Sequence, residues 1–499
     1  MPPSTMPQIT TIVHLMLENR SLDNVLGWLY EKRAPSRVFP DKSSAAYDGL
    51  IAGKFSQPLD GQSYPIVPIP DEYAKKPIPI HDPYEEMYGA IYWNGVMNQV
   101  FGDQNIITGM PSSGTPPTMK GFYQDYHSVA EGEWHGKDIL WTYRGTLPIM
   151  NLLAGAYSVS DAWFSSVPTQ TNPNRAYSLI GTSQGRENNL HYSAVETYVA
   201  DTVFNALGKA GKTWGLYYTD LWHAPKDKPN QKQCFTQYTF PNLTNASNGE
   251  IGTHADFFQR IQDGNLPNFT YLEPKWGYGI EGYYTQGTDY HPPTLVSPGE
   301  AFLFQVFLAL AKSKQWDEML FIVTFDEHGG TYDHVEPSWG AKNPDGIKGS
   351  YGFNFDLFGV RVPTILISPF AYPASVFRAK AESAYPFDHT SCLKTLLGWA
   401  GVDLAKWNFG QRVQNAPTFD YVLADHHVNW GGFPGTENAL AAEPPPEPEH
   451  DPSDVSALFV GIPFASVRAI LHDNKTLEDI QAAIAEYHRD PQKFEATLG

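Results

Sequence analysis

The segment ITTIVHLML, residues 9–17, decides the fold class, because it is an almost unbroken run of apolar and β-branched residues. Such a run is typical of a strand that is buried on both faces of a parallel sheet. Glu18 and Asn19 follow it directly, and Ser21 then opens a helical stretch. A carboxylate and an amide are therefore expected at the carboxyl end of a strand, where open α/β sheets bind their ligands.

The stretch MLFIVTF, residues 319–325, predicts a second buried strand of the same kind. Asp326 and Glu327 follow it, and Gly329 and Gly330 then release the chain into a loop. Two adjacent carboxylates concentrate like charge, which is costly unless a proton or a cation is shared. The pair is therefore either a solvated acidic turn or a metal site, in the same position as the polar pair after the first strand.

Strands and helices alternate through the rest of the pattern. Residues 298–314 predict an amphipathic helix, residues 362–368 predict a third strand, and residues 388–391 cap a helix that runs to Trp399. This alternation predicts the α/β class, in three α/β/α layers around a mainly parallel sheet.

Two long segments, residues 35–130 and 225–295, are rich in Pro, Gly, Asn and Tyr and show little periodicity. We expect them to be loop insertions that wall a cleft. The stretch EPPPEPE, residues 443–449, is typical of an extended spacer. The expected organisation is a catalytic domain over residues 1–440, a spacer over 441–452 and a short C-terminal helical tail over 453–499, with one helix from Thr476.

The composition limits the classes of binding partner and the cellular compartments that we expect for this protein. The formal net charge of −20 argues against nucleic acid as the partner. The two cysteines, Cys234 and Cys392, leave one disulfide open and exclude a disulfide-rich scaffold. The sequence has no signal-peptide pattern and no apolar run long enough for a transmembrane segment. We expect a soluble protein, cytoplasmic by default, or exported by a non-standard route or as a mature form.

A polar turn and several histidines complete the candidate residues. Residues 169–175, TQTNPNR, place hydroxyl groups just before a helix-like segment. The turn is either a plain helix cap or the site of a hydroxyl nucleophile activated by a metal. His81, His223 and His291 lie in polar loops, where a histidine is either an ordinary surface residue or a group that binds phosphate and transfers protons.

Four motifs, taken in order, resemble the phosphoesterase family of bacterial phospholipases C, Francisella-type acid phosphatases and plant non-specific phospholipases C. They are ENRSLDNVLG (residues 18–27), TNPNR (171–175), DYHPP (289–293) and DEHGGTYDHV (326–335). Arg361-Val362-Pro363, Ile367-Ser368-Pro369 and Asp388-His389-Thr390-Ser391 are also similar to family elements. Leu22 and Asn24 depart from the Phe and His of many members, and the acidic pair is Asp-Glu where the acid phosphatases resemble Asp-Asp.

The resemblance implies an alkaline-phosphatase-like fold with one divalent metal ion, Ca, Mg, Mn or Zn, beside a hydroxyl nucleophile. It implies that the metal is held by Glu18, Asn19, Thr171, Asp326 and Glu327, and that Thr171 is the nucleophile. The residues expected to bind the substrate are His81, His223, His291 and Arg175, and the residues expected to assist catalysis are His81, Asp289 and His291. His291, oriented by Asp289, is expected to protonate the leaving oxygen.

The expected reaction is hydrolysis of a phosphoric ester through a phosphothreonine intermediate. The first expectation is phospholipase C-type cleavage of phosphodiesters, with lipid head groups as substrates. One alternative is an acid phosphatase that acts on soluble phosphomonoesters. An alternative of another class is a catalytically silent, metal-stabilised binding protein, against which the intact nucleophile and acidic pairs argue.

Overall fold

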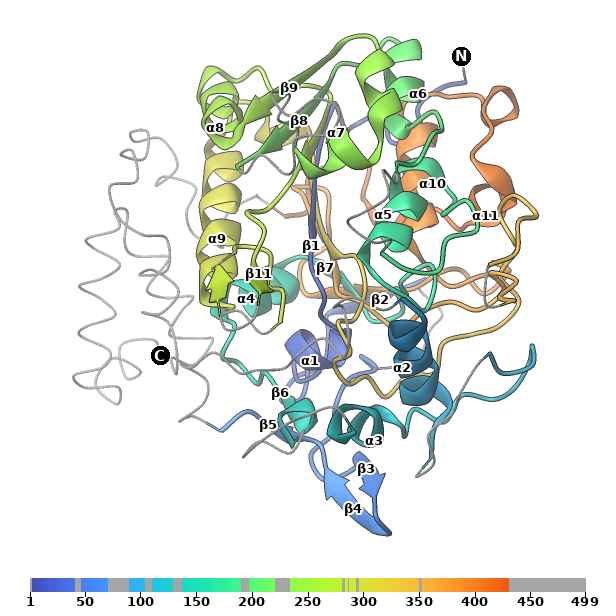
Figure 1. Cartoon of the computed structure of the whole chain (residues 1–499). Helices are drawn as coiled ribbons and strands as arrows, with labels where there is room; N and C mark the ends of the chain where they lie inside the picture. The colour runs from blue at the N-terminus through green and yellow to red at the C-terminus, as the bar shows by residue number, and fades with distance from the viewer. Residues whose placement is uncertain are drawn as a thin grey trace, which may run out of the picture.

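A large sheet between two layers of helices forms the body of the protein in its computed structural model (Figure 1). The structure describes residues 2–40, 46–70, 89–103, 110–128, 137–189, 197–219, 234–280, 283–285, 287–292, 296–349 and 352–429. His81, His223, the predicted spacer and the predicted C-terminal tail all lie outside these residues.

Nine of the described strands form the large sheet. Their order across the sheet is β2 (Arg37–Phe39), β15 (Ser375–Phe377), β7 (Ser158–Ser160), β14 (Thr364–Ile367), β13 (Met319–Phe325), β1 (Thr11–Leu17), β10 (Phe269–Leu272), β8 (Trp214–Tyr218) and β9 (Gly249–Thr253). Within this set β14 runs antiparallel to its neighbours β13 and β7, and the other pairs are parallel. The mainly parallel sheet predicted from the sequence is confirmed.

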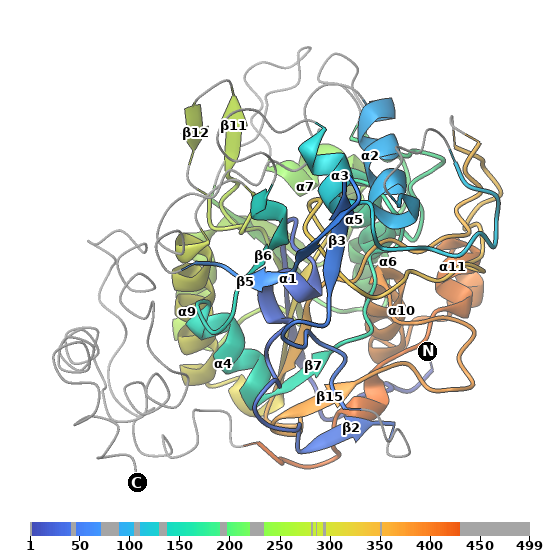
Figure 2. The same ribbon diagram turned by 90° about the horizontal axis from the view of Figure 1, so that it is seen from below.

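Helices cover both faces of this sheet (Figures 1 and 2). One face carries α4 (Pro148–Ala156), α8 (His254–Asp263) and α9 (Ser297–Lys312), and the other carries α5 (Thr171–Ile180), α6 (Val203–Lys209), α10 (His389–Trp399) and α11 (Gly410–Asn415). The central strands β1 and β13 are buried along their whole length, as expected for strands covered on both faces. The three-layer α/β/α class is therefore confirmed.

The predicted elements agree with the observed ones to within a few residues. β13 has the predicted bounds, and β1 begins two residues later than the predicted run. The predicted helix at residues 298–314 is α9, which starts at Ser297. Asp388 caps α10 through a reciprocal capping box with Ser391, as its position before the helix indicated.

The expectation that residues 35–130 and 225–295 are only loop insertions is wrong. The second segment contains β9, α8 and β10, and β10 pairs with the central strand β1. The first segment contributes β2, the strand at one edge of the large sheet. These strands have three to five residues each, which is too short for a periodic pattern to appear among the prolines and asparagines around them.

Other elements of the first segment gather at the carboxyl end of the parallel strands, as Figure 2 shows from that side. They are α2 (Gly89–Phe101), α3 (Phe122–His127), the pair β3 (Ser56–Leu59) and β4 (Gln62–Pro65), and β5 (Val67–Pro68), which pairs with β6 (Trp141–Thr142). The helix that follows β1, α1 (Leu22–Leu26), lies at the same end. The second segment also contains α7 (Phe235–Thr239) and the antiparallel pair of β11 (Tyr278–Ile280) and β12 (Tyr283–Thr285).

Both cysteines are free and buried, so the disulfide left open by the sequence is absent from the structure. Across the described part of the chain, no helix has the length and apolar character needed to cross a bilayer.

Candidate active site

The tips of β1 and β13 meet at the centre of the sheet. The two strands pair in parallel with Leu17 opposite Phe325, so Glu18 and Asp326 leave the sheet side by side. The main-chain N–H of Asp326 donates to the Leu17 carbonyl (3.2 Å), and that of Asn19 donates to Asp326 Oδ1 (3.3 Å). Residues that are more than 300 positions apart in the sequence are thus held together by the register of two adjacent strands.

Glu327 is fixed by the glycine turn that follows it. Its N–H donates to Asp326 Oδ1 (2.8 Å), and its Oε2 accepts from the N–H of Gly329 (2.7 Å). Gly329 has a φ of +60°, and a Cβ there would lie 2.2 Å from the carbonyl oxygen of Asn19. A glycine is therefore required for the second turn to pack against the first.

Thr171 enters the site as the first residue of α5. Its hydroxyl donates to Asn19 Oδ1 at 3.4 Å, and its side chain is buried. The turn before it is pinned by Asn174, whose amide group donates to the carbonyls of Val167, Thr169 and Gln170 and accepts from the N–H of Val167. A hydroxyl is therefore held at a helix N-terminus, where the helix dipole favours an anion.

Arg175, one turn further along α5, lies beneath the carboxylates. Its Nη2 is 3.1 Å from Glu18 Oε1, and its Nε is 3.2 Å from Asp326 Oδ2. Its Nη1 donates to the hydroxyl of Tyr271 (3.2 Å), and its guanidinium stacks over Trp276. The side chain is 1% exposed, so in this structure protein groups engage the guanidinium on all sides.

His291 faces the same centre from the loop before α9. Its Nδ1–H donates to the carbonyl of Pro292, and its Nε2 accepts from the amide of Asn19 at 3.0 Å. Nε2 is also 3.9 Å from Glu18 Oε2. Asp289 is fully buried and accepts main-chain N–H groups of Gly277 and His291. Asp289 therefore holds the backbone of the loop that carries His291.

The site concentrates buried negative charge. Burial raises the pKa of Glu18 well above its ordinary value, Asp326 raises it further, and Arg175 opposes the shift. Burial likewise raises the pKa of Asp326 to about 6, with Arg175 opposing and Glu327 adding to the rise. Glu18, Asp326 and Glu327 are buried near one guanidinium, which contacts the first two, and their excess negative charge is costly unless a proton or a cation compensates it.

The donor set fits a divalent cation. Glu18 Oε1 is buried and accepts no hydrogen bond, although Arg175 lies at ion-pair distance from it. The carboxylates of Glu18, Asp326 and Glu327, the amide oxygen of Asn19 and the Thr171 hydroxyl are all oxygen donors, which Ca²⁺, Mg²⁺ and Mn²⁺ prefer and Zn²⁺ also accepts. A divalent cation would also offset the excess charge.

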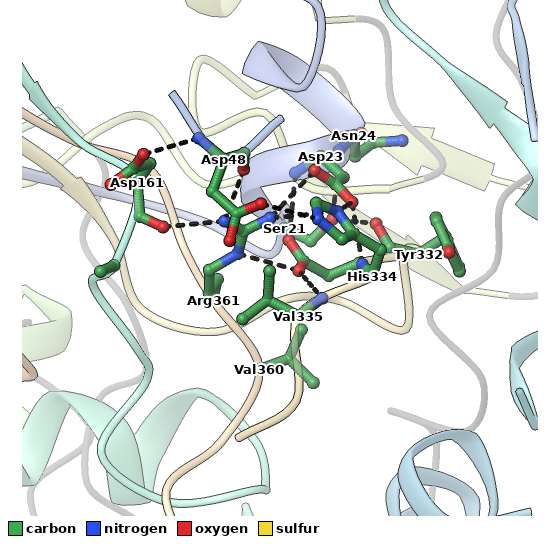
Figure 3. A network of polar contacts seen from close by, with 12 residues as sticks. Ser21, Asp23, Asn24, Asp48, Asp161, Tyr332, His334, Val335, Val360 and Arg361 are labelled. Atoms are coloured by element: carbon green, nitrogen blue, oxygen red, sulfur yellow. Dashed lines mark hydrogen bonds and ion pairs between the residues drawn. The ribbon is translucent and has the colours of Figure 1, made fainter. Parts of the chain in front are cut away.

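A second buried cluster, which we call the Arg361 network, supports both turns (Figure 3). Arg361 is fully buried, with Nη2 at 3.0 Å from Asp23 Oδ1 and Nε at 2.9 Å from Asp333 Oδ1. His334 lies 2.6 Å from Asp23 and 3.2 Å from Asp48. Asp23 belongs to α1 after the first strand tip, and Asp333 to the loop after the second, so the network ties these two loops together.

The residues Asp23, Asp333 and His334 lie close enough to hold a metal ion. Arg361 already bridges the two carboxylates. Burial alone would lower the pKa of His334, but its hydrogen bonds to Asp23 and Asp48 outweigh that effect and raise it to about 9. Arg361 and a charged His334 therefore offset most of the negative charge of Asp23, Asp48 and Asp333, so this cluster has less need of a metal ion than the centre at Glu18 and Asp326.

Sequence reasoning missed the roles of the Arg361 network, although Arg361, Asp23, Asp333 and His334 belong to the motifs quoted above. A buried arginine shared by two distant acids leaves no local pattern in a sequence.

A short motif in the sequence matches an unrelated class of enzyme. Residues 181–185, GTSQG, match the Gly-x-Ser-x-Gly signature of serine hydrolases. Here Gly181 ends a helix in the left-handed conformation, and the Ser183 hydroxyl donates to the Arg186 carbonyl, so the strand-to-helix elbow of those enzymes is not formed.

Comparisons with known proteins identify the family of this chain. The phosphoesterase family model matches residues 9–402. Non-specific phospholipase C3 of Arabidopsis thaliana is 32% identical over 411 residues, which cover 79% of this chain and 70% of the relative. Phospholipase C A of Mycobacterium tuberculosis is 26% identical, with 82% of this chain and 76% of the relative covered.

Among solved structures, a protein of the alkaline phosphatase superfamily from Vibrio parahaemolyticus aligns at 15% identity with a TM-score of 0.32. The alignment covers 55% of this chain and 66% of that one. At so low a score, the fold class rests on the sheet order and the layers described above.

The chain belongs to the phosphoesterase family and is a phosphoric ester hydrolase. The alternative of a catalytically silent binding protein is thereby set aside.

Proposed function

We propose that the protein is a metal-dependent phosphodiesterase of phospholipase C type that acts through a phosphothreonine on Thr171. The observation that carries the proposal is the convergence of a helix N-terminal hydroxyl and two acidic strand tips at one buried centre. Both curated relatives described above are named phospholipase C. Glu18, Asn19, Asp326, Glu327 and Thr171 would hold the cation.

In the first step Thr171 Oγ attacks the phosphorus in line, and the bond between phosphorus and the leaving ester oxygen breaks. A divalent cation, when bound, would polarise a phosphoryl oxygen and favour ionisation of the hydroxyl. The N-terminus of α5 favours the negative charge carried by the phosphoryl oxygens. Arg175 holds the carboxylates of Glu18 and Asp326 in place from beneath, a role we propose for it in place of the predicted contact with substrate, because its side chain is buried among protein groups.

In this step the Thr171 hydroxyl loses one proton and the leaving oxygen gains one. We assign its transfer to His291, because Nε2 of this histidine faces Asn19 and Glu18 at the centre. In the second step a water attacks the phosphothreonine, the bond between phosphorus and Thr171 Oγ breaks, and the hydroxyl regains its proton. The products are an alcohol from the first step and a phosphomonoester from the second.

Replacement of the nucleophile tests this proposal. Thr171→Ala is expected to lower kcat on bis(p-nitrophenyl) phosphate by about 10³-fold or more, since the covalent route is closed. Thr171→Ser keeps a hydroxyl and serves as the matched control, with most of the activity retained. Near-native turnover by Thr171→Ala, with an unchanged thermal unfolding midpoint, would refute the nucleophile assignment.

A substrate panel separates the phospholipase C reading from the acid phosphatase alternative. The wild-type enzyme is given bis(p-nitrophenyl) phosphate, p-nitrophenyl phosphate and phosphatidylcholine vesicles at equal phosphorus concentration. We expect a higher kcat/KM on the diesters and release of phosphocholine from the vesicles. A higher kcat/KM on the monoester, with no phosphocholine released, would establish the phosphatase alternative.

A further inference from the structure

A chain of buried side chains reaches the site from α2 and α3, the two helices that lie together over the carboxyl end of the sheet (Figures 1 and 2). His328 Nε2–H donates to Gln99 Oε1 (2.8 Å), and Gln99 Nε2 donates to Asp125 Oδ2 (2.8 Å). On the other side of the ring, His328 Nδ1 lies 3.4 Å from Glu327 Oε2, where the edge of the ring packs against the carboxylate. We call Asp125, Gln99 and His328 the relay.

His328 is also joined to the other strand tip through its main chain. Its carbonyl oxygen accepts from the N–H (3.0 Å) and the hydroxyl (2.6 Å) of Thr331. Thr331 Oγ1 accepts in turn from the N–H of Ser21 (2.8 Å), two residues after Asn19. A residue that fixes the His328 ring therefore acts on both turns of the candidate metal site.

Burying the polar groups of the relay costs free energy, and their hydrogen bonds fix the orientation of each side chain. Gln99 and His328 are each 1% exposed and Asp125 is 6% exposed, so every polar group in the relay must be satisfied by protein. The Gln99 amide group donates to Asp125 and its carbonyl oxygen accepts from His328, which fixes the orientation of its partners on both sides. Asn98 adds a second donor to Asp125 at 3.2 Å. An apolar cluster would fill the same space more cheaply but would orient nothing.

We propose that Gln99 and Asp125 are positioning residues: they hold the His328 ring against the Glu327 carboxylate, and the packed ring restricts that carboxylate to the orientation that binds the divalent cation. The inference rests on the proposed function, in which Glu327 is a metal ligand. Side chains that lie directly behind a metal ligand are known to set both metal affinity and ligand orientation. The segment that carries α2 and α3 is then part of the catalytic apparatus and not only a wall of the site.

The test uses the full chain with Gln99→Leu, which keeps the volume and removes both hydrogen bonds of the relay. Gln124→Leu, the same change on a partly exposed side chain of α3, is the matched control. We expect Gln99→Leu to lower kcat about 10- to 100-fold, with a much smaller change in KM. We expect it to lose its bound Ca, Mg, Mn or Zn, measured together by elemental analysis, at a lower EDTA concentration than the wild type.

A combined variant separates positioning from general stability. Because the relay acts through Glu327, Gln99→Leu is expected to cause no further loss of metal retention in a Glu327→Gln background. Additive losses would overturn the proposal, as would wild-type kcat and metal retention in Gln99→Leu, or an equal loss in Gln124→Leu. Should Gln99→Leu fail to fold, Asp125→Asn replaces it, with a several-fold loss expected and an unchanged value contradicting the relay.

The proposed function and the relay fail in different ways. A wild-type enzyme without phosphodiester turnover contradicts the function, but metal retention still compares Gln99→Leu with its control. An active wild type with an unaffected Gln99→Leu contradicts the relay alone.

Discussion

Arg175 Nη2 lies 3.1 Å from Glu18 Oε1, and both side chains are almost fully buried. The same guanidinium contacts Asp326, so the positive charge of Arg175 pairs with a carboxylate at the tip of each central strand. Since Thr171 stands one turn before Arg175 on this helix, the contact also fixes the hydroxyl relative to the carboxylates. The geometry of the site thus depends on a charge that lies beneath it.

Removal of this charge is the first prediction. Arg175→Met keeps the length of the side chain but leaves Glu18 and Asp326 buried without their guanidinium. We expect it to lower the free energy of unfolding by about 3 kcal/mol in EDTA, measured by urea denaturation. Arg175→Lys, which restores the charge without the two-pronged contact, should lose less. An Arg175→Met variant as stable as the wild type would show that the ion pairs do not hold the site together.

The second prediction concerns metal removal and pH. In the metal-free protein the folded pKa of Asp326 is raised to about 6 and that of Glu18 is also raised. The folded state therefore binds more protons than the unfolded state, and its stability falls as pH rises from about 4 to about 6. A bound cation requires the ionised carboxylates, so its stabilisation grows over the same window.

The measurement is the thermal unfolding midpoint of metal-replete and EDTA-treated protein across pH 4.5 to 8. We expect the gap between the two to be largest above about pH 7 and to close toward about pH 4.5. If the difference between the two midpoints stays constant over this range, metal binding does not displace protons from these carboxylates.

The third prediction concerns the Arg361 network. His334 faces Asp23, Asp48, Asp333 and the guanidinium of Arg361, and its pKa is raised from 6.5 to about 9. A raised folded pKa stabilises the protein fully below about pH 6.5, and this contribution is lost as pH rises through about 9. His334→Gln should therefore be less stable than the wild type at pH 6, by up to about 3 kcal/mol, and nearly equal to it above pH 9.

Urea denaturation at pH 6 and pH 9.5 measures this difference. His426→Gln, at an exposed histidine that also pairs with an aspartate, is the control and should change little at either pH. A stability difference between His334→Gln and the wild type that does not depend on pH would mean that the imidazole is not charged in the folded protein.

The central part of the fold could be predicted because β1 and β13 are seven-residue apolar runs, each ending in polar residues. Several of the shorter strands around them could not. β2, β7 and β15 have three residues each, and β10 has four. Such strands are defined by their pairing partners far along the chain and not by their own periodicity.

Some residues of the candidate site could likewise be predicted from the sequence, and others could not. Glu18, Asn19, Asp326 and Glu327 were predictable because each follows a strand whose end is visible in the sequence. The proximity of Thr171 came from the family resemblance, since nothing local places α5 beside β1. The relay and the Arg361 network depend on contacts between residues more than 200 positions apart, which a single sequence does not reveal.

A crystal structure of the full chain with its divalent metal and orthovanadate tests the central claim most directly. The claim predicts vanadium facing Thr171 Oγ, and one metal ion within about 2.0–2.6 Å of oxygens from Glu18, Asn19, Asp326 and Glu327. Vanadate bound away from Thr171, or a metal ion that none of these four residues ligates, would contradict it.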